Sequence, residues 1–151
     1  MQSFFQEVFE YQRQANQLVI PLLVQLAERR SLHRARQVMS HVLNAHAIWN
    51  ARIVGAARPF EVWQEHPVQN YESLDQENLR ATLNLIQECP LDSMIDYQTG
   101  AGKAYQNSVG DIFFHISNHT THHRAHLIQY LRQEGVEVPM TDYIFLKRPQ
   151  L

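Results

Sequence analysis

The sequence is poor in cysteine, glycine and proline, and these absences narrow the range of possible structures. Cys89 is the only cysteine, which excludes an internal disulfide and a zinc site built from several thiolates. The 151 residues include only five glycines and six prolines. A sandwich of short strands needs a turn signal about every 8–12 residues, so this composition favours long helices instead.

An excess of positive charge and long hydrophobic runs are also missing. The net charge is −2 with neutral histidines, and no basic run occurs, so we expect no nucleic-acid partner. No apolar stretch reaches the roughly 18 residues that span a bilayer, and the first residues do not resemble a signal peptide. We therefore expect no membrane association and a cytoplasmic location. The length and the 44% of apolar residues fit one globular domain over residues 1–151.

Histidine, in contrast, is abundant and concentrated. Five of the nine histidines lie between Ser108 and Gly135, and they are His115, His119, His122, His123 and His126. Imidazole is the commonest metal ligand among side chains, so this density indicates a metal site.

Apolar residues recur with the 3.6-residue period of a helix in four stretches. The first helix is predicted to begin with a capping box after Ser3 and to be kinked, not ended, by Pro21. The second is predicted to run from Ser31, as its N-cap, to near Gly55.

The other two helices have similar start and stop signals. The third is predicted to open at a capping box over residues 73–76 and to stop before Pro90. The fourth is predicted to begin at a capping box formed by Ser108 and Asp111 and to end at Gly135.

The segments between and after these helices are long. Residues 56–72 form a loop whose aromatic residues, Phe60 and Trp63, indicate that it folds back over another part of the protein. Residues 91–107 read as a short hairpin or extended loop with a glycine turn. Residues 136–151 read as an extended tail that is packed down. The fold class is therefore all-α, a four-helix bundle in which tight up-down-up-down loops are not required.

Two histidines of the fourth helix are spaced to bind one ion. His119 and His123 lie four residues apart on the inner face or its edge, where their rings stack one turn above the other. His115, His122 and His126 fall on one shoulder of the same helix. This spacing is a weak signal alone, because it arises often by chance.

A third ligand has to come from another helix, and the second helix offers His41 and His46. Its apolar stripe places His46 toward the interior and His41 at the shoulder. Amphipathicity thus prefers His46, but the pattern leaves both residues open.

Two segments together resemble the DinB-like family. They are residues 40–52, which read Ser-His-Val-Leu-Asn-Ala-His-Ala-Ile-Trp-Asn-Ala-Arg, and residues 118–124, which read Asn-His-Thr-Thr-His-His-Arg. The resemblance extends over nearly the whole chain, including the closing residues 139–143. It implies a four-helix bundle of up-down-down-up order, a bound zinc or nickel ion, and a homodimer.

The resemblance also implies a ligand set. In the family, a histidine eight residues before a tryptophan joins the two histidines of an Asn-His-x-x-x-His-Arg motif. By that match His41, eight residues before Trp49, is the third metal ligand beside His119 and His123. The family commonly has an acidic residue at the position of His46, so His46 is a departure that could serve as a base, an alternative ligand or a substrate contact.

Three imidazoles leave metal positions open, which is typical of a catalytic site. A bound ion could acidify water or hold a low-molecular-weight thiol as thiolate. With the resemblance, this predicts a metal-dependent enzyme, a thiol-dependent S-transferase or a hydrolase, that acts on a small molecule. His46, His122 and His126 are the candidate catalytic proton carriers, and a structural role remains the alternative for each.

Other readings remain open. A metal-stabilised, non-catalytic stress-response binding module is the alternative function. Arg52 and Arg124 could orient an anionic group or pair with surface carboxylates. Several aromatic residues could line a substrate pocket or only pack in the core: Trp49, Phe60, Trp63 and Tyr130. A di-iron carboxylate bundle is disfavoured, because it needs Glu-x-x-His motifs that this sequence lacks.

Overall fold

The computed structural model describes residues 1–149. Within them the protein is mostly helical, with five α-helices and a small two-stranded sheet, which confirms the predicted helical fold class and the hairpin before the last long helix. The elements are α1 (Gln2–Gln25), α2 (His33–Ile53), α3 (Tyr71–Glu88), β1 (Met94–Gln98), β2 (Ala104–Ser108), α4 (Val109–Gln133) and α5 (Tyr143–Lys147). None of the helices in this part of the chain has the length and hydropathy that crossing a membrane requires.

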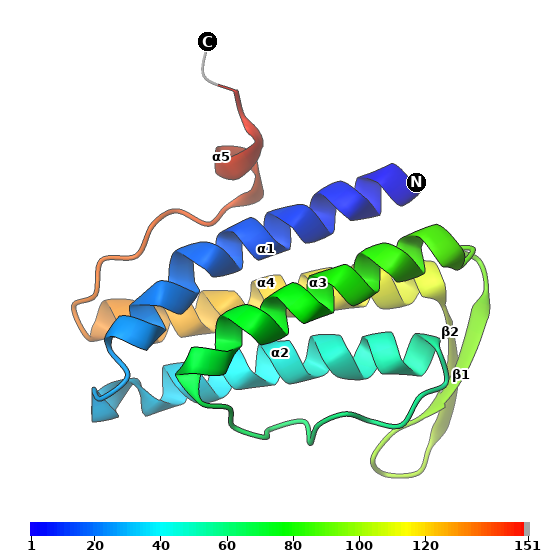
Figure 1. The fold of residues 1–151 in the computed structure, drawn as a ribbon, viewed down its shortest axis with the longest axis horizontal. Helices are drawn as coiled ribbons and strands as arrows, with labels where there is room; N and C mark the ends of the chain where they lie inside the picture. Colours follow the sequence, from blue (N-terminus) through cyan, green and yellow to red (C-terminus); the bar gives the residue numbers. More distant parts are fainter. Residues whose placement is uncertain (150–151) are drawn as a thin grey trace.

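Four long helices lie side by side, and two run against the other two (Figure 1). α1 and α4 run in one direction, and α2 and α3 run in the opposite direction. α1 contacts α3 and α4, and α2 contacts the same two helices. Because α2 and α3 are parallel, residues 54–70 have to return along the length of α2 before α3 begins.

The predicted N-terminal cap is found at one of the four long helices and is absent at the other three. At α4 the capping box is present: the Asp111 N–H donates to Ser108 Oγ at 3.0 Å, and the Ser108 N–H donates to Asp111 Oδ2 at 3.2 Å. The predicted caps at Ser3, Ser31 and Ser73 are wrong.

Tertiary contacts explain why those helices begin elsewhere. α1 already starts at Gln2, whose side chain donates to the Ile86 carbonyl at 2.8 Å. α3 starts at Tyr71, which is completely buried. Ser31 lies inside a 3-10 turn, Arg30–Leu32, that precedes α2. Packing has therefore overridden the local capping signal.

The chain end differs from the predicted extended tail. It contains α5, whose first turn closes when the N–H groups of Phe145 and Leu146 donate to the Asp142 carbonyl. The segment is held on α1, because Tyr11 Oη donates to the Thr141 carbonyl at 2.9 Å.

Two apolar clusters fill the ends of the helix assembly, and buried polar residues lie between them. Phe9, Ile86 and Phe113 belong to one cluster, and Leu23, Tyr71 and Leu131 belong to the other. We call the buried polar residues between them the polar belt. Its members are Gln12, Asn16, Ser40, His41, Asn44, His46, Asn50, Asp75, Asn78, Thr82, Thr120 and Arg124.

Candidate metal centre

α2 and α4 bring three imidazoles together midway along their length. His41, His119 and His123 each offer a ring nitrogen, and these three atoms lie within 4.8 Å of one another. His41 is buried, and the other two side chains are half-buried. The Nε2 atoms of His41 and His119 are 3.1 Å apart, and the ring centroids of His119 and His123 are 4.3 Å apart. We call these residues the three-histidine cluster.

A backbone carbonyl fixes the tautomer of His41. His41 Nδ1 lies 3.0 Å from the Val62 carbonyl oxygen. A carbonyl can only accept, so Nδ1 carries the hydrogen, and in the neutral ring the lone pair is on Nε2. That lone pair points at His119 Nε2. A second hydrogen bond of this kind is the usual support of a metal-ligating histidine.

The spacing of the nitrogens fits a small divalent ion. Metal–nitrogen bonds of about 2.0–2.1 Å at tetrahedral angles place neighbouring nitrogens about 3.3 Å apart. The 3.1 Å between His41 and His119 is close to that value. His123 completes the set, with all three ligand nitrogens within 4.8 Å of one another.

The cluster keeps its rings neutral. Burial, and then the neighbouring imidazoles, lower the pKa of His119 to about 3 and that of His123 to about 4. Burial also lowers the pKa of His41, against the opposing effect of its bond to Val62. A ring that is unprotonated at neutral pH has a lone pair free to bind a metal ion.

The loop between α2 and α3 covers the cluster, so the prediction that it folds back over another part of the protein is confirmed. The Trp63 ring stacks on His41, with centroids 3.9 Å apart and ring planes 10° from parallel. Trp63 follows Val62, whose carbonyl accepts from Nδ1 of the same His41 ring.

Polar residues of α2 anchor this loop. Asn44 donates to the Gln64 carbonyl at 2.7 Å, which leaves Asn44 Oδ1 to accept from His66 Nε2 at 2.6 Å. The His66 N–H donates to Ser40 Oγ at 3.1 Å. Ser40 and Asn44 thus hold the loop on α2, and this keeps the Val62 carbonyl at His41.

His46 lies apart from the three-histidine cluster. The Thr82 hydroxyl donates to Asn50 Oδ1 at 3.0 Å, so His46 Nε2 has to donate to Thr82 Oγ1, at 2.7 Å. Burial lowers the pKa of His46 to about 3. The structure thus brings His41, the residue implied by the resemblance, next to His119, whereas amphipathicity preferred His46.

The three shoulder histidines are exposed and surround the cluster. The ring centroids of His122 and His126 lie 5.0 and 5.9 Å from that of His123, and the ring of His115 lies 5.6 Å from that of His119. All three rings are therefore open to solvent beside the cluster. Their catalytic role stays a prediction.

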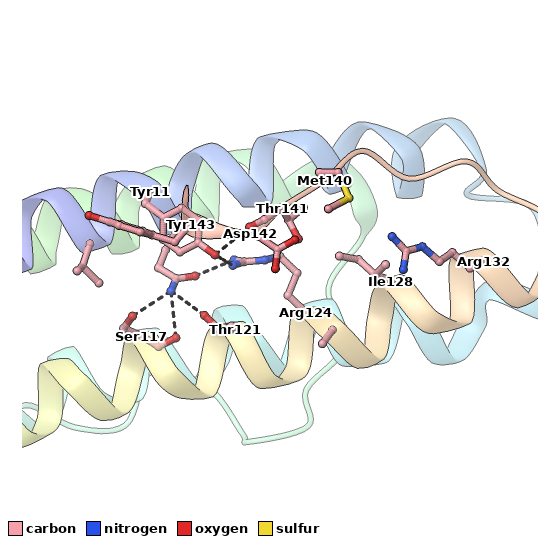
Figure 2. A pocket seen from close by; sticks show the side chains of 13 residues that line it. Tyr11, Ser117, Thr121, Arg124, Ile128, Arg132, Met140, Thr141, Asp142 and Tyr143 are labelled. Carbon is pink, nitrogen blue, oxygen red and sulfur yellow. Dashed lines mark hydrogen bonds between the residues drawn. The ribbon is translucent and has the colours of Figure 1, made fainter. Parts of the chain in front are cut away.

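The two arginines that sequence analysis singled out form no ion pair in residues 1–149. Arg124 points from α4 toward α1 (Figure 2). Its Nη1 donates to Gln12 Oε1 at 2.7 Å and to Asn16 Oδ1 at 3.1 Å, and its Nη2 donates to Tyr11 Oη at 3.0 Å. Arg124 borders a cavity of about 570 Å³ between α1, α4 and the chain end.

Sequence reasoning missed the partners that orient the histidines. The Val62 carbonyl has no signature, because every residue has one. The aromatic character of Trp63 in a polar loop was the only available signal. Thr82 and Asn50 read as ordinary polar residues, and their bond to His46 depends on how α2 and α3 pack.

The chain was compared with known protein families, curated proteins and solved structures. A model of the DinB family matches residues 1–150 of the chain. No curated protein and no solved structure matches it significantly.

Proposed function

Because the chain belongs to the DinB family, we propose that His41, His119 and His123 hold one divalent metal ion, zinc or nickel, in a metal-dependent enzyme. The hydrogen bond of His41 Nδ1 to Val62 carries the proposal, because it aims the His41 Nε2 lone pair at His119. His46 differs in this respect, because its hydrogen-bonded ring nitrogen, Nε2, meets the hydroxyl oxygen of Thr82 and not a second imidazole nitrogen.

Such an ion supplies a Lewis acid that lowers the pKa of a thiol or water bound beside it. The chain's residues do the rest. His122 and His126, exposed next to His123, carry protons between the site and solvent. Trp63 covers His41 and keeps water from that side of the ring. His46 is not among the proton carriers of this proposal, because its Nε2–H is engaged by Thr82.

The reaction class is thiol-dependent S-transfer or hydrolysis of a small molecule. Three nitrogen ligands without a fourth protein ligand are the pattern of a catalytic site, whereas structural zinc sites are closed by four. The half-burial of His119 and His123 supports access for a thiol or a water molecule. A non-catalytic, metal-stabilised binding module is the second candidate. The cluster has no fourth histidine, cysteine or carboxylate ligand within residues 1–149, which weighs against it.

The family also bears on architecture and assembly. We assign α1–α4 to an up-down-down-up four-helix bundle, supported by their opposed directions and mutual contacts (Figure 1). A homodimer remains a proposal that rests on the family resemblance, and sedimentation of the purified chain tests it.

The full chain, purified with and without added Zn²⁺ or Ni²⁺, tests the function. We expect one ion per chain by elemental analysis. We then expect metal-dependent loss of a low-molecular-weight thiol in the presence of an electrophile, or metal-dependent hydrolysis of an ester or amide. Full metal loading without turnover of any of these would favour the binding module, and no metal uptake would reject both functions.

A further inference from the structure

Arg52, in the last turn of α2, is a half-buried cation without a carboxylate partner in residues 1–149. Its guanidinium carbon lies 4.2 Å from the ring centroid of Trp49 and 4.9 Å from that of Tyr97. Two aromatic rings thus hold its position, and burial lowers its pKa. A guanidinium fixed in this way keeps its fork of N–H groups available for a planar or tetrahedral oxyanion.

Arg52 lines a cavity of about 450 Å³ between the end of α2 and the β1–β2 hairpin. Arg58 and Asp96 also line it. Arg58 pairs with Glu61, whereas Asp96 accepts from the neutral Gln106 amide at 2.8 Å and keeps its negative charge on the hairpin side of the cavity. Of the two arginines that line this cavity, Arg52 is the one without a carboxylate partner in residues 1–149.

A line of aromatic side chains connects this cavity with the three-histidine cluster. Trp49 packs on His115 with ring centroids 4.8 Å apart, and His115 lies next to His119. Trp49, Tyr97 and His115 also border a smaller cavity of about 200 Å³. Arg52 follows His41 on the same helix, about 16 Å along the axis at 1.5 Å per residue.

We propose that Arg52 binds the anionic end of an elongated substrate whose other end reaches the three-histidine cluster along Trp49 and His115. This rests on the proposed function, because the cluster has to bind the reacting group. It defines the substrate class as a small molecule with a carboxylate or phosphate at one end. It also gives the hairpin a role, because Tyr97 of β1 holds the Arg52 guanidinium.

Binding to the Co²⁺-loaded full chain tests the proposal, since a thiolate bound to Co²⁺ changes its absorption spectrum. The carboxylate probes are mercaptohexanoate and mercaptooctanoate. Each is compared with the mercapto-alcohol of the same length and with the phosphate ester of that alcohol. We expect the wild type to bind at least one anionic probe about tenfold more tightly than its alcohol. The better anion identifies carboxylate or phosphate as the natural end group.

Variants assign the preference to one side chain. In Arg52→Gln the anion preference disappears, in Arg52→Lys it is reduced, and in the control Arg58→Gln it remains. Metal stoichiometry stays the same in all three. Equal binding of acids, phosphates and alcohols to the wild type, or an undiminished preference in Arg52→Gln, overturns the proposal.

A second measurement keeps the two proposals distinguishable. If no thiol probe binds the Co²⁺-loaded chain, the proposed thiol chemistry is rejected, but the anion subsite is still decided by NMR of the metal-free protein. We expect the Arg52 Nε–H signal to shift with octanoate or octyl phosphate and not with octanol. An unchanged signal rejects the subsite independently of the metal.

Discussion

α4 carries polar side chains on two sides. The two sides differ in whether other side chains supply complementary hydrogen-bond partners. Toward α1, Arg124 gives its hydrogens to Gln12, Asn16 and Tyr11, all of which offer oxygen acceptors. Toward α2, His119 Nε2 faces another ring nitrogen, His41 Nε2, at 3.1 Å. On the α1 side, protein oxygen atoms accept the arginine hydrogens. On the α2 side, two potential metal-ligand atoms lie opposite each other.

This difference assigns different roles to the two sides of α4, stability to the α1 side and metal binding to the α2 side. A buried charge that is fully hydrogen-bonded holds its helices in register, and removing one partner leaves the others unpaired. Imidazoles that share a space without a carboxylate or hydroxyl between them gain from an ion that binds their lone pairs. Removal of a side chain should therefore affect stability on the α1 side and metal binding on the α2 side.

The largest effect is expected from loss of a ligand. His119→Ala, His123→Ala and His41→Ala should each lose stoichiometric metal binding, a greater loss than the roughly 10–100-fold that follows removal of a supporting partner. The matched control is His46→Ala, on the same helix as His41. Elemental analysis and metal titration measure both. Full occupancy in a His119 or His123 variant, or a greater loss in His46→Ala than in His41→Ala, would show that the ligand set is wrong.

The next effect concerns the α1 side. Arg124→Met leaves the neutral amide oxygens of Gln12 and Asn16 buried and unpaired, so we expect the free energy of unfolding to fall by about 2–4 kcal/mol. Metal stoichiometry of the folded protein should not change. Arg132→Met, an exposed position on α4, is the control and should stay within about 0.5 kcal/mol of wild type. Chemical denaturation measures all three proteins, and a small change in Arg124→Met would contradict a structural role.

A smaller effect is expected from the loop that supports His41. Trp63→Ala removes the ring stacked on His41 and loosens the segment that carries the Val62 carbonyl. We expect metal affinity to fall about 10–100-fold, as for other supporting partners, with a modest change in stability because Trp63 is half exposed. Trp63→Phe should restore most of the affinity. Equal affinities in Trp63→Ala and wild type would mean that the loop does not orient the ligand.

The placement of His41 shows where sequence reasoning succeeds and where it stops. Helical periodicity located the long helices, because burying one apolar face imposes that spacing. It ranked His46 above His41, because it assumes that the other face meets solvent. On α2 that assumption is wrong: residues 38–46 are all buried, since the loop that contains Trp63 covers the outer side. The family resemblance supplied what periodicity could not.

The capping signals illustrate the same limit at helix ends. Ser108 and Asp111 cap α4 because the two partners lie three residues apart, and the bonds of the Val109 and Gly110 N–H groups to the 91–93 segment support the same start. Ser73 has similar neighbours, but the buried Tyr71 extends α3 past it. Local patterns therefore succeed where local bonds decide, and they fail where a distant contact determines which residues are buried.

The last effect, absent at neutral pH, is a pH dependence that belongs to His46, whose imidazole donates to the Thr82 hydroxyl oxygen. Burial lowers its pKa to about 3 in the folded protein, from 6.5 in an exposed chain. Between these values the unfolded chain binds the extra proton, so stability is complete above about pH 6.5 and declines as the pH falls toward 3. One such group contributes up to about 1.4 kcal/mol per pH unit over that window.

His46→Gln removes this titration while keeping an N–H donor for Thr82. In metal-free protein, the free energy of unfolding of the variant should therefore fall less steeply with acid than that of the wild type, and the curves should run parallel above about pH 6.5. Protonation of His119 and His123 adds to the acid slope of both proteins and cancels in the difference. Denaturant titrations at a series of pH values measure it. Parallel curves throughout the acid range would mean that His46 stays accessible to protons in the folded state, and the contrast with the three-histidine cluster would be lost.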